Sequence, residues 1–273
     1  MKTVLFHVGD AADLETRLEV AFDLAERLQA HLVGLNTLTP ASMPAPVIGR
    51  GASAVVLAER TERNRRLSAE LEERFRGASH RRGLGCEWRA QEGEPLEVVA
   101  FHSRYADLVV AGLPRPNTLE EYLVGPPIDR LALVAACPVL LLPAAYGGKT
   151  VGRRVLVAWK SSRTCARTLR EATPLLRLAE EVTLLTVSEP SLRHVGGLDI
   201  ATVLARRGVT ATIRQDFGKG GDAGAEVLAH ARAVGADMVV MGAYGHSRLR
   251  ELVLGGATQR ALSDSPLPLL MSH

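Results

Sequence analysis

The chain has 273 residues, which allows two domains of ordinary size, since compact domains usually hold about 100–200 residues. Hydrophobic residues make up 47% and charged residues 23%, a composition that is typical of globular proteins and excludes a disordered chain. The 33 Lys and Arg residues barely exceed the 30 Asp and Glu residues, which argues against a dedicated nucleic-acid-binding protein.

The N-terminal residues 3–8 form a short apolar run that is too brief for a secretory signal, so we expect a first β-strand there. The longest apolar run, residues 131–142, contains Pro138 and falls short of the roughly 20 residues that a membrane helix needs. The three cysteines are odd in number and lack C-x-x-C spacing, which fits a reducing compartment. These features predict a cytoplasmic protein without a membrane segment.

Residues 40–53 are rich in Pro, Ala, Ser and Gly, and residues 54–82 predict one long helix with charges of both signs. Such a mixed run is usually a solvated helix face with i,i+4 ion pairs. The alternative is a docking surface for an anionic partner.

The chain contains an internal repeat. Residues 105–112 and 235–242 share the pattern Ala-Asp-x-Val-Val-x-Gly at an offset of 130 positions. Similar apolar runs also open and close each copy. We therefore predict two copies of one fold, residues 1–145 and 151–273, joined by a short glycine-bearing linker at 146–150.

In the second copy, short runs rich in Val and Leu alternate with stretches of helical period, which is typical of βαβ units. We expect strands near 154–159, 181–187, 209–215, 237–242 and 267–271, and helices near 163–179, 196–207, 222–234 and 256–264. The strands lack polar alternation, which indicates helices on both faces of a sheet. The predicted fold class is α/β, with a doubly wound five-stranded parallel sheet in each copy.

A glycine motif follows the fourth strand of the second copy. Gly242, Gly245 and Gly255 are spaced G-x2-G-x9-G, and a helix begins directly afterwards. Glycines let a backbone approach a ligand closely, and the N-terminus of a helix attracts phosphate. The spacing alone fits a phosphate cradle and a set of tight turns equally well.

The tandem organisation and the motif Met-Gly-x2-Gly-x9-Gly resemble the universal stress protein (UspA-like) superfamily over essentially the whole chain. The resemblance implies a Rossmann-like, adenine nucleotide alpha hydrolase-like fold for each half and an ATP site, with Mg2+, in the C-terminal half. The implied contact residues are Ala158, Trp159, Lys160, Val187, Met241, Gly242, Gly245, Gly255, Gly256, Ala257 and Thr258.

Two positions of the second half depart from the family pattern. Gly256 stands where nucleotide-binding members usually carry Ser or Thr, and Lys160 stands where they usually carry an acidic residue. A lysine side chain cannot accept a hydrogen bond from a ribose or an adenine amino group. Trp159 is suited to stacking on adenine or to packing at the interface between the halves.

The first half departs further from the motif. The offset of 130 relates Gly245 to Arg115, and it relates the start of the last helix to Pro126, Pro127 and Ile128. Proline has no backbone N–H to offer a phosphate. We predict that the first half has lost the cradle and serves structure, the alternative being that Arg115 contacts an anionic ligand.

The chain shows no metal-ligand spacing, no nucleophile elbow and no dedicated hydrolytic base. We therefore expect ATP hydrolysis to be slow or absent, and ATP to act as a regulatory ligand. The two halves are expected to pack as an intramolecular pseudo-dimer, and further association into a homodimer stays open. The rival hypothesis is a stress protein that binds no nucleotide and serves as an interaction or dimerisation module; a catalytic enzyme is a third.

Overall fold

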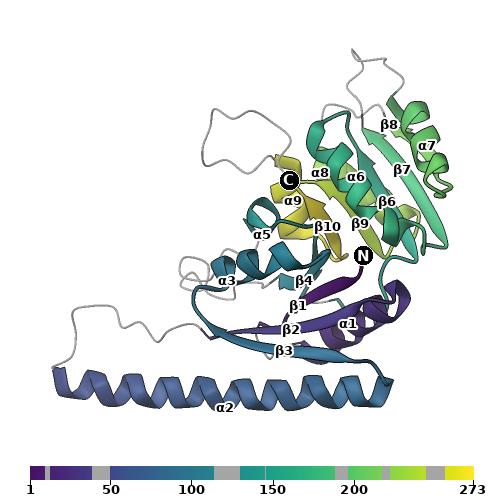
Figure 1. Cartoon of the computed structure of the whole chain (residues 1–273). Coiled ribbons are helices and arrows are strands. Elements are labelled where there is room, and N and C mark those ends of the chain that lie inside the picture. The colour runs from purple at the N-terminus through teal and green to yellow at the C-terminus, as the bar shows by residue number, and fades with distance from the viewer. Residues whose placement is uncertain are drawn as a thin grey trace.

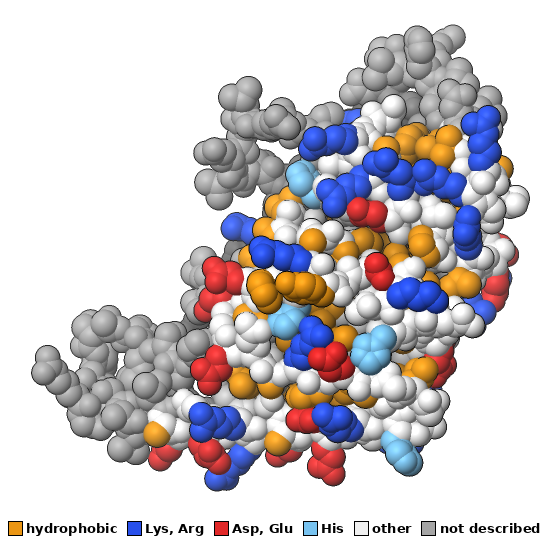
Figure 2. Space-filling view, viewed as in Figure 1, with side chains coloured by type: hydrophobic (Ala, Val, Ile, Leu, Met, Phe, Trp, Pro, Cys, Tyr) orange, Lys and Arg blue, Asp and Glu red, His pale blue; other side chains and the backbone are white. Residues whose placement is uncertain are grey.

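The computed structural model describes residues 1–9, 13–38, 50–113, 130–144, 146–187, 196–216, 222–243 and 256–273. Strands and helices alternate along the chain, and the helices cover both faces of a central sheet (Figure 1). Figure 2 shows that charged side chains of both signs are interspersed over the face in view.

The first half contains five strands. Its elements are β1 (Thr3–His7), α1 (Leu14–Leu28), β2 (His31–Leu38), α2 (Arg50–Arg82), β3 (Cys86–Glu92), α3 (Pro95–His102), the 3-10 helix η1 (Ser103–Tyr105), β4 (Leu108–Leu113), α5 (Leu131–Val134) and β5 (Val139–Pro143). The predicted long helix is confirmed as α2, which begins at residue 50 and extends beyond the neighbouring strands in Figure 1.

The second half repeats this order. Its elements are β6 (Arg154–Trp159), α6 (Arg163–Leu176), β7 (Glu181–Val187), α7 (Gly196–Arg206), β8 (Thr212–Asp216), α8 (Ala223–Ala233), β9 (Met238–Gly242), α9 (Gly256–Asp264) and β10 (Leu269–Ser272). The predicted strands and helices are all present. The largest boundary differences are α6, which ends at 176 instead of 179, and β8, which starts at 212 instead of 209.

Each half is a parallel five-stranded sheet, as predicted, and the two sheets join into one. The strand order is β3-β2-β1-β4-β5-β10-β9-β6-β7-β8, and the only antiparallel contact between these strands is that of β5 with β10. The three residue pairs at this junction are Leu141 with Leu269, Leu140 with Leu270, and Val139 with Met271. Leu140 and Leu270 are equivalent in the repeat, so a pseudo-twofold axis passes between them and the halves form an intramolecular pseudo-dimer.

The aspartate of the repeated motif fastens the start of the first strand in the second half. The Asp237 carboxylate accepts hydrogen bonds from the backbone N–H groups of Gly152, Arg153 and Arg154, at 2.9 to 3.2 Å. Asp237 therefore acts at the amino ends of β6 and β9, away from the carboxyl ends where ligands of open α/β sheets bind.

The first half repeats this arrangement. The Asp107 carboxylate, 130 positions earlier, accepts from the backbone N–H groups of Lys2 at 2.6 Å and Thr3 at 3.0 Å. The bond from Lys2 is the main cause that lowers the pKa of Asp107 below its ordinary value. The shared Ala-Asp pattern is thus explained by strand anchoring.

The core consists of two layers on either side of the sheet. Side chains of α1, α2, α6 and α7 pack on one face, and those of α3, α5, α8 and α9 pack on the other. Alternation along β6 illustrates the division, because Val155 and Val157 belong to the first layer and Leu156 to the second. Leucine, valine and alanine dominate both layers, in keeping with an aromatic content of 4%.

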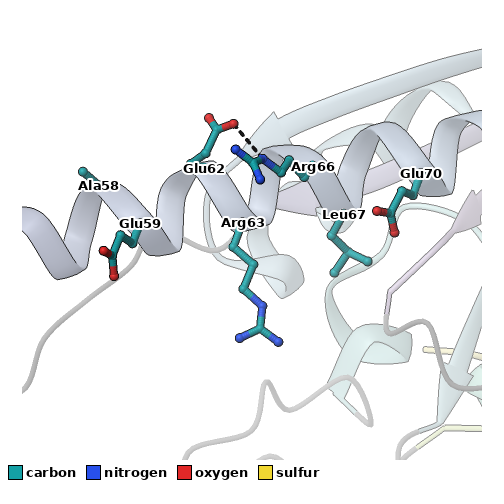
Figure 3. Close-up of a pocket in the computed structure, with 7 residues that line it drawn as sticks. All are labelled: Ala58, Glu59, Glu62, Arg63, Arg66, Leu67 and Glu70. Carbon is teal, nitrogen blue, oxygen red and sulfur yellow. Dashed lines mark hydrogen bonds and ion pairs between the residues drawn. The ribbon is translucent and has the colours of Figure 1, made fainter.

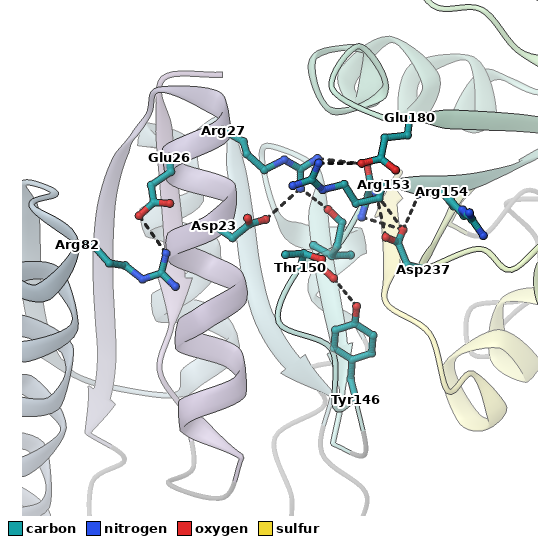
Figure 4. A network of polar contacts seen from close by, with 12 residues as sticks. Asp23, Glu26, Arg27, Arg82, Tyr146, Thr150, Arg153, Arg154, Glu180 and Asp237 are labelled. Atoms are coloured by element: carbon teal, nitrogen blue, oxygen red, sulfur yellow. Dashed lines mark hydrogen bonds and ion pairs between the residues drawn. The ribbon is translucent and has the colours of Figure 1, made fainter.

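Polar contacts hold the chain within the linker and directly after it (Figure 4). The Arg27 guanidinium on α1 donates to the carbonyl of Val151 at 2.6 Å and forms an ion pair with Asp23 at 3.0 Å. The Tyr146 hydroxyl donates to the Thr150 carbonyl at 2.6 Å. These contacts fix the path of the chain between β5 and β6.

Among the described helices, none has the length and apolar character that crossing a membrane would require.

Candidate functional site

The predicted contact residues on β6 and β9 lie together at the carboxyl ends of neighbouring strands. Ala158 of β6 is the register partner of Met241 of β9, and Trp159 and Gly242 follow them. Parallel pairing places these strand ends at one edge of the sheet, where the strand order reverses between β6 and β9. Open α/β sheets bind ligands at such a switch point.

Gly242 packs directly against the beginning of α6. A Cβ atom at this position would lie 2.9 Å from the backbone nitrogen of Cys165 and 3.1 Å from the Thr164 hydroxyl oxygen. Because a real Cβ does not approach backbone this closely, glycine is required here by helix packing alone. The first glycine of the motif therefore has a structural reason that is independent of any ligand.

The start of α6 is capped locally. The Ser162 side chain accepts a hydrogen bond from the backbone N–H of Cys165 at 3.2 Å, and its hydroxyl lies 3.2 Å from that of Thr164. This N-cap holds the positive end of the α6 dipole at the same edge of the sheet as Gly242.

Two buried polar atoms near this edge have no hydrogen-bond partner among the described residues. They are the indole nitrogen Nε1 of Trp159 and the hydroxyl oxygen of Thr186, whose residues are register partners on β6 and β7. Trp159 is 9% exposed and Thr186 is 8% exposed. Buried polar groups are normally paired, so an unpaired donor and an unpaired hydroxyl on adjacent strands are an unusual feature of this part of the fold.

Trp159 packs in the core of the second half. It belongs to the same layer as Val157, and β6 is separated from β10 at the junction by β9. The position thus differs from the predicted alternative of packing at the interface between the halves. The ring is covered, and its N–H is the feature that lacks a partner.

The other predicted residues are distributed around this edge. Lys160 is exposed directly after β6, Val187 is the last residue of β7, and Gly256 and Ala257 begin α9. Thr258, in the first turn of α9, is 4% exposed. Gly245 and Gly255 lie outside the described residues.

The equivalent edge of the first half is filled by its own side chains. Arg17, in the first turns of α1, is 8% exposed, and a Cβ atom at Gly112 would lie 2.7 Å from its guanidinium. Gly112 corresponds to Gly242 in the repeat. Beside Arg17, His7 is 6% exposed; burial first, and the charge of Arg17 second, lower the pKa of His7 to about 4.

A separate surface hollow of about 700 Å³ lies along α2 (Figure 3). The described residues that line it all belong to α2, and an ion pair joins Arg66 to Glu62 at 3.0 Å. This solvated helix face is far in the fold from the strand ends described above. Within the described residues, His, Cys, Asp and Glu side chains form no group of three suited to hold a metal ion.

The fold and the strand-end site define a tandem, doubly wound α/β protein. A model of the universal stress protein family matches residues 1–143 and 152–273, and the chain therefore belongs to this family. No curated protein sequence matches the chain.

Solved structures that span the whole chain show the same architecture. A universal stress protein from Archaeoglobus fulgidus DSM 4304 is 17% identical, covers 99% of this chain and 95% of its own, and has a TM-score of 0.74. One described as a putative universal stress protein from Pseudomonas aeruginosa UCBPP-PA14 is 16% identical, with coverages of 100% and 93% and a TM-score of 0.60. A functionally unknown protein from Pseudomonas aeruginosa PAO1 is 16% identical, with coverages of 100% and 92% and a TM-score of 0.58. At these identities the similarity concerns the fold.

The residue pattern did not lead us to Thr186. Alternation along β7 places it on the same face as Val182 and Leu184, and one position before the predicted contact Val187. A polar residue one position before the carboxyl end of β7, on the side of the strand that otherwise carries Val182 and Leu184, was the available signal.

Proposed function

We propose that this universal stress protein binds an adenine nucleotide, ATP with Mg2+, at the carboxyl ends of β6, β7 and β9. The nucleotide acts as a regulatory ligand, which stabilises the fold or shifts its association by binding one state preferentially. In this proposal the domains are residues 1–145 and 151–273, and the second carries the site.

The observation that carries the proposal is the unpartnered pair of Trp159 and Thr186. The indole N–H can donate and the hydroxyl can donate or accept, which suits the ring nitrogens and hydroxyls of a nucleoside. The N-terminus of α9 and the motif glycines would hold the phosphates, through backbone N–H groups that need no Ser or Thr at Gly256. Mg2+ would be bound through the phosphate oxygens.

The exposed Lys160 fits this arrangement as a phosphate contact in place of the usual acidic residue. In the first half, Arg17 and His7 occupy the corresponding edge, and Pro126 and Pro127 of the aligned segment supply no N–H. We therefore assign one nucleotide site to the chain.

The test is calorimetric titration of ATP, with Mg2+, into the wild type, Gly245→Arg and Arg115→Gly. Gly245→Arg copies the first-half residue into the second half and should abolish binding. Arg115→Gly makes the converse change in the first half and should leave binding intact. Absence of binding to the wild type would refute the proposal and favour the rival interaction module, which the departures at Lys160 and Gly256 support.

Thr186→Val refines this test because valine has nearly the shape of threonine. Removing an unpaired buried hydroxyl should raise the free energy of unfolding of the free protein by about 1 kcal/mol. The same variant should weaken ATP binding. A variant that is stabilised yet binds ATP normally would remove Thr186 from the site.

A further inference from the structure

The outer face of α3 and η1 carries a cluster of exposed hydrophobic side chains. Of the six large hydrophobic residues that are exposed in the described part of the chain, four lie on α3, η1 and α5: Phe101, Tyr105, Leu133 and Val134. Phe101 is 46% exposed and Tyr105 is 68% exposed, and their ring centroids are 6.0 Å apart. We call these four residues the α3 patch.

A hydrogen bond ties together the elements that carry the α3 patch. The Ser103 hydroxyl oxygen accepts a hydrogen bond from the backbone N–H of Ala136 at 2.9 Å, which ties η1 to the residues that follow α5. Clusters of large apolar side chains at a protein surface commonly mark binding sites, whereas single ones need no explanation.

The second half has polar residues in place of three of the four side chains; Tyr105 corresponds to Val234 at an offset of 129 and to Gly235 at an offset of 130. Its buried helix positions match those of α3 at an offset of 129, so Phe101 corresponds to His230, which contacts Asp216 at 2.6 Å. In the last helix of each half, the offset of 130 relates Leu133 to Ser263 and Val134 to Asp264. The apolar patch is therefore particular to the first half and is not a general consequence of the fold.

Charges of opposite sign flank Phe101. Glu97 and Arg104 are both exposed, lie on either side of Phe101, and are about 10 Å apart along the helix axis. The Arg104 guanidinium lies 5.4 Å from the centroid of the Phe101 ring. Neither Glu97 nor Arg104 forms an ion pair with another described residue.

We propose that the α3 patch is the contact surface between two copies of this chain. A twofold axis at Phe101 would set the two α3 helices antiparallel, so that Glu97 of each copy faces Arg104 of the other. In this arrangement the same surface of each copy supplies both partners of the two ion pairs and both sides of the aromatic contact. An isologous dimer interface is self-complementary in this way. A surface for an acidic partner would instead be expected to carry positive charge at both ends.

The test is the oligomeric state of the whole chain without nucleotide, measured by sedimentation over a concentration series. We expect a concentration-dependent dimer. Glu97→Arg and Arg104→Glu should each raise its dissociation constant about tenfold or more, because each sets like charges against one another. The double variant, Glu97→Arg with Arg104→Glu, restores opposite charges and should recover the wild-type constant.

Glu226→Arg is the matched control. Glu226 occupies the position in α8 that Glu97 occupies in α3, and its reversal should leave the dimer unchanged. Circular dichroism should show native helix content in every variant, since all these residues are at the surface. A monomeric wild type, a dimer that withstands both single reversals and Phe101→Glu, or a double variant without recovery would each overturn the proposal.

Discussion

Asp237→Ala tests the structural explanation of the repeated aspartate. The substitution leaves three backbone N–H groups without their charged acceptor, those of Gly152, Arg153 and Arg154. A buried hydrogen bond to a charged group contributes roughly 1.5–3 kcal/mol, but water can replace the acceptor at the exposed Arg154 and partly at Arg153. Because water partly replaces the lost acceptor, the loss is smaller than the sum of three such hydrogen bonds. We therefore expect the free energy of unfolding to fall by about 2–4 kcal/mol.

The assay is urea unfolding at neutral pH, followed by far-UV circular dichroism, with Asp107→Ala as the matched variant. Asp107 holds only two N–H groups and is exposed, so its replacement should cost about half as much, roughly 1–2 kcal/mol. ATP affinity should be unaffected in both variants, because both carboxylates lie at the amino ends of the strands. A loss at Asp237 no larger than that at Asp107, or a selective loss of ATP binding, would refute the anchoring role.

Three further substitutions and one control variant test the packing and the buried histidine. Folding lowers the pKa of His7 from 6.5 to about 4, so between these pH values the unfolded chain binds a proton at His7 and the folded chain does not. The free energy of unfolding of the wild type should therefore fall by up to about 3 kcal/mol as the pH is lowered from 6.5 to 4. His7→Ala, which copies Ala158, should reduce that slope in urea unfolding at several pH values; an unchanged slope would contradict the shifted pKa. Gly34→Ala would place a Cβ 2.9 Å from the rings of Phe75 and Trp88 and should cost about 1–3 kcal/mol in the same assay, a neutral result being incompatible with this packing. Gly242→Ala should cost a similar 1–3 kcal/mol because α6 must shift, whereas Gly85→Ala, with no atom within 4 Å of the new Cβ, should be close to neutral; equal effects would exclude the contact with Cys165.

Much of the fold was predictable because local and repeated signals agree. The offset between Asp107 and Asp237 indicated two copies, and the alternation of Val- and Leu-rich runs with helical periods located the strands of the second half. The junction of β5 with β10 could not be predicted in this way. Both are short and mostly apolar strands, and apolar character does not specify which neighbour a strand pairs with.

The site was only partly predictable for a related reason. The glycine spacing located the end of β9, yet it gave no sign that Gly242 is required by the start of α6. Arg17 is a second example, since an arginine in an amphipathic helix is expected at the surface, whereas tertiary packing buries it over Gly112. Such contacts depend on which helix crosses which strand end, and residue order alone does not determine that.

Nucleotide binding by the second half alone is tested most directly by the number of ATP molecules bound per chain at saturation, counted by equilibrium dialysis with Mg2+. We expect one per wild-type chain and none in Gly245→Arg. Two per chain would contradict the loss of the site in the first half, and none in the wild type would contradict nucleotide binding itself.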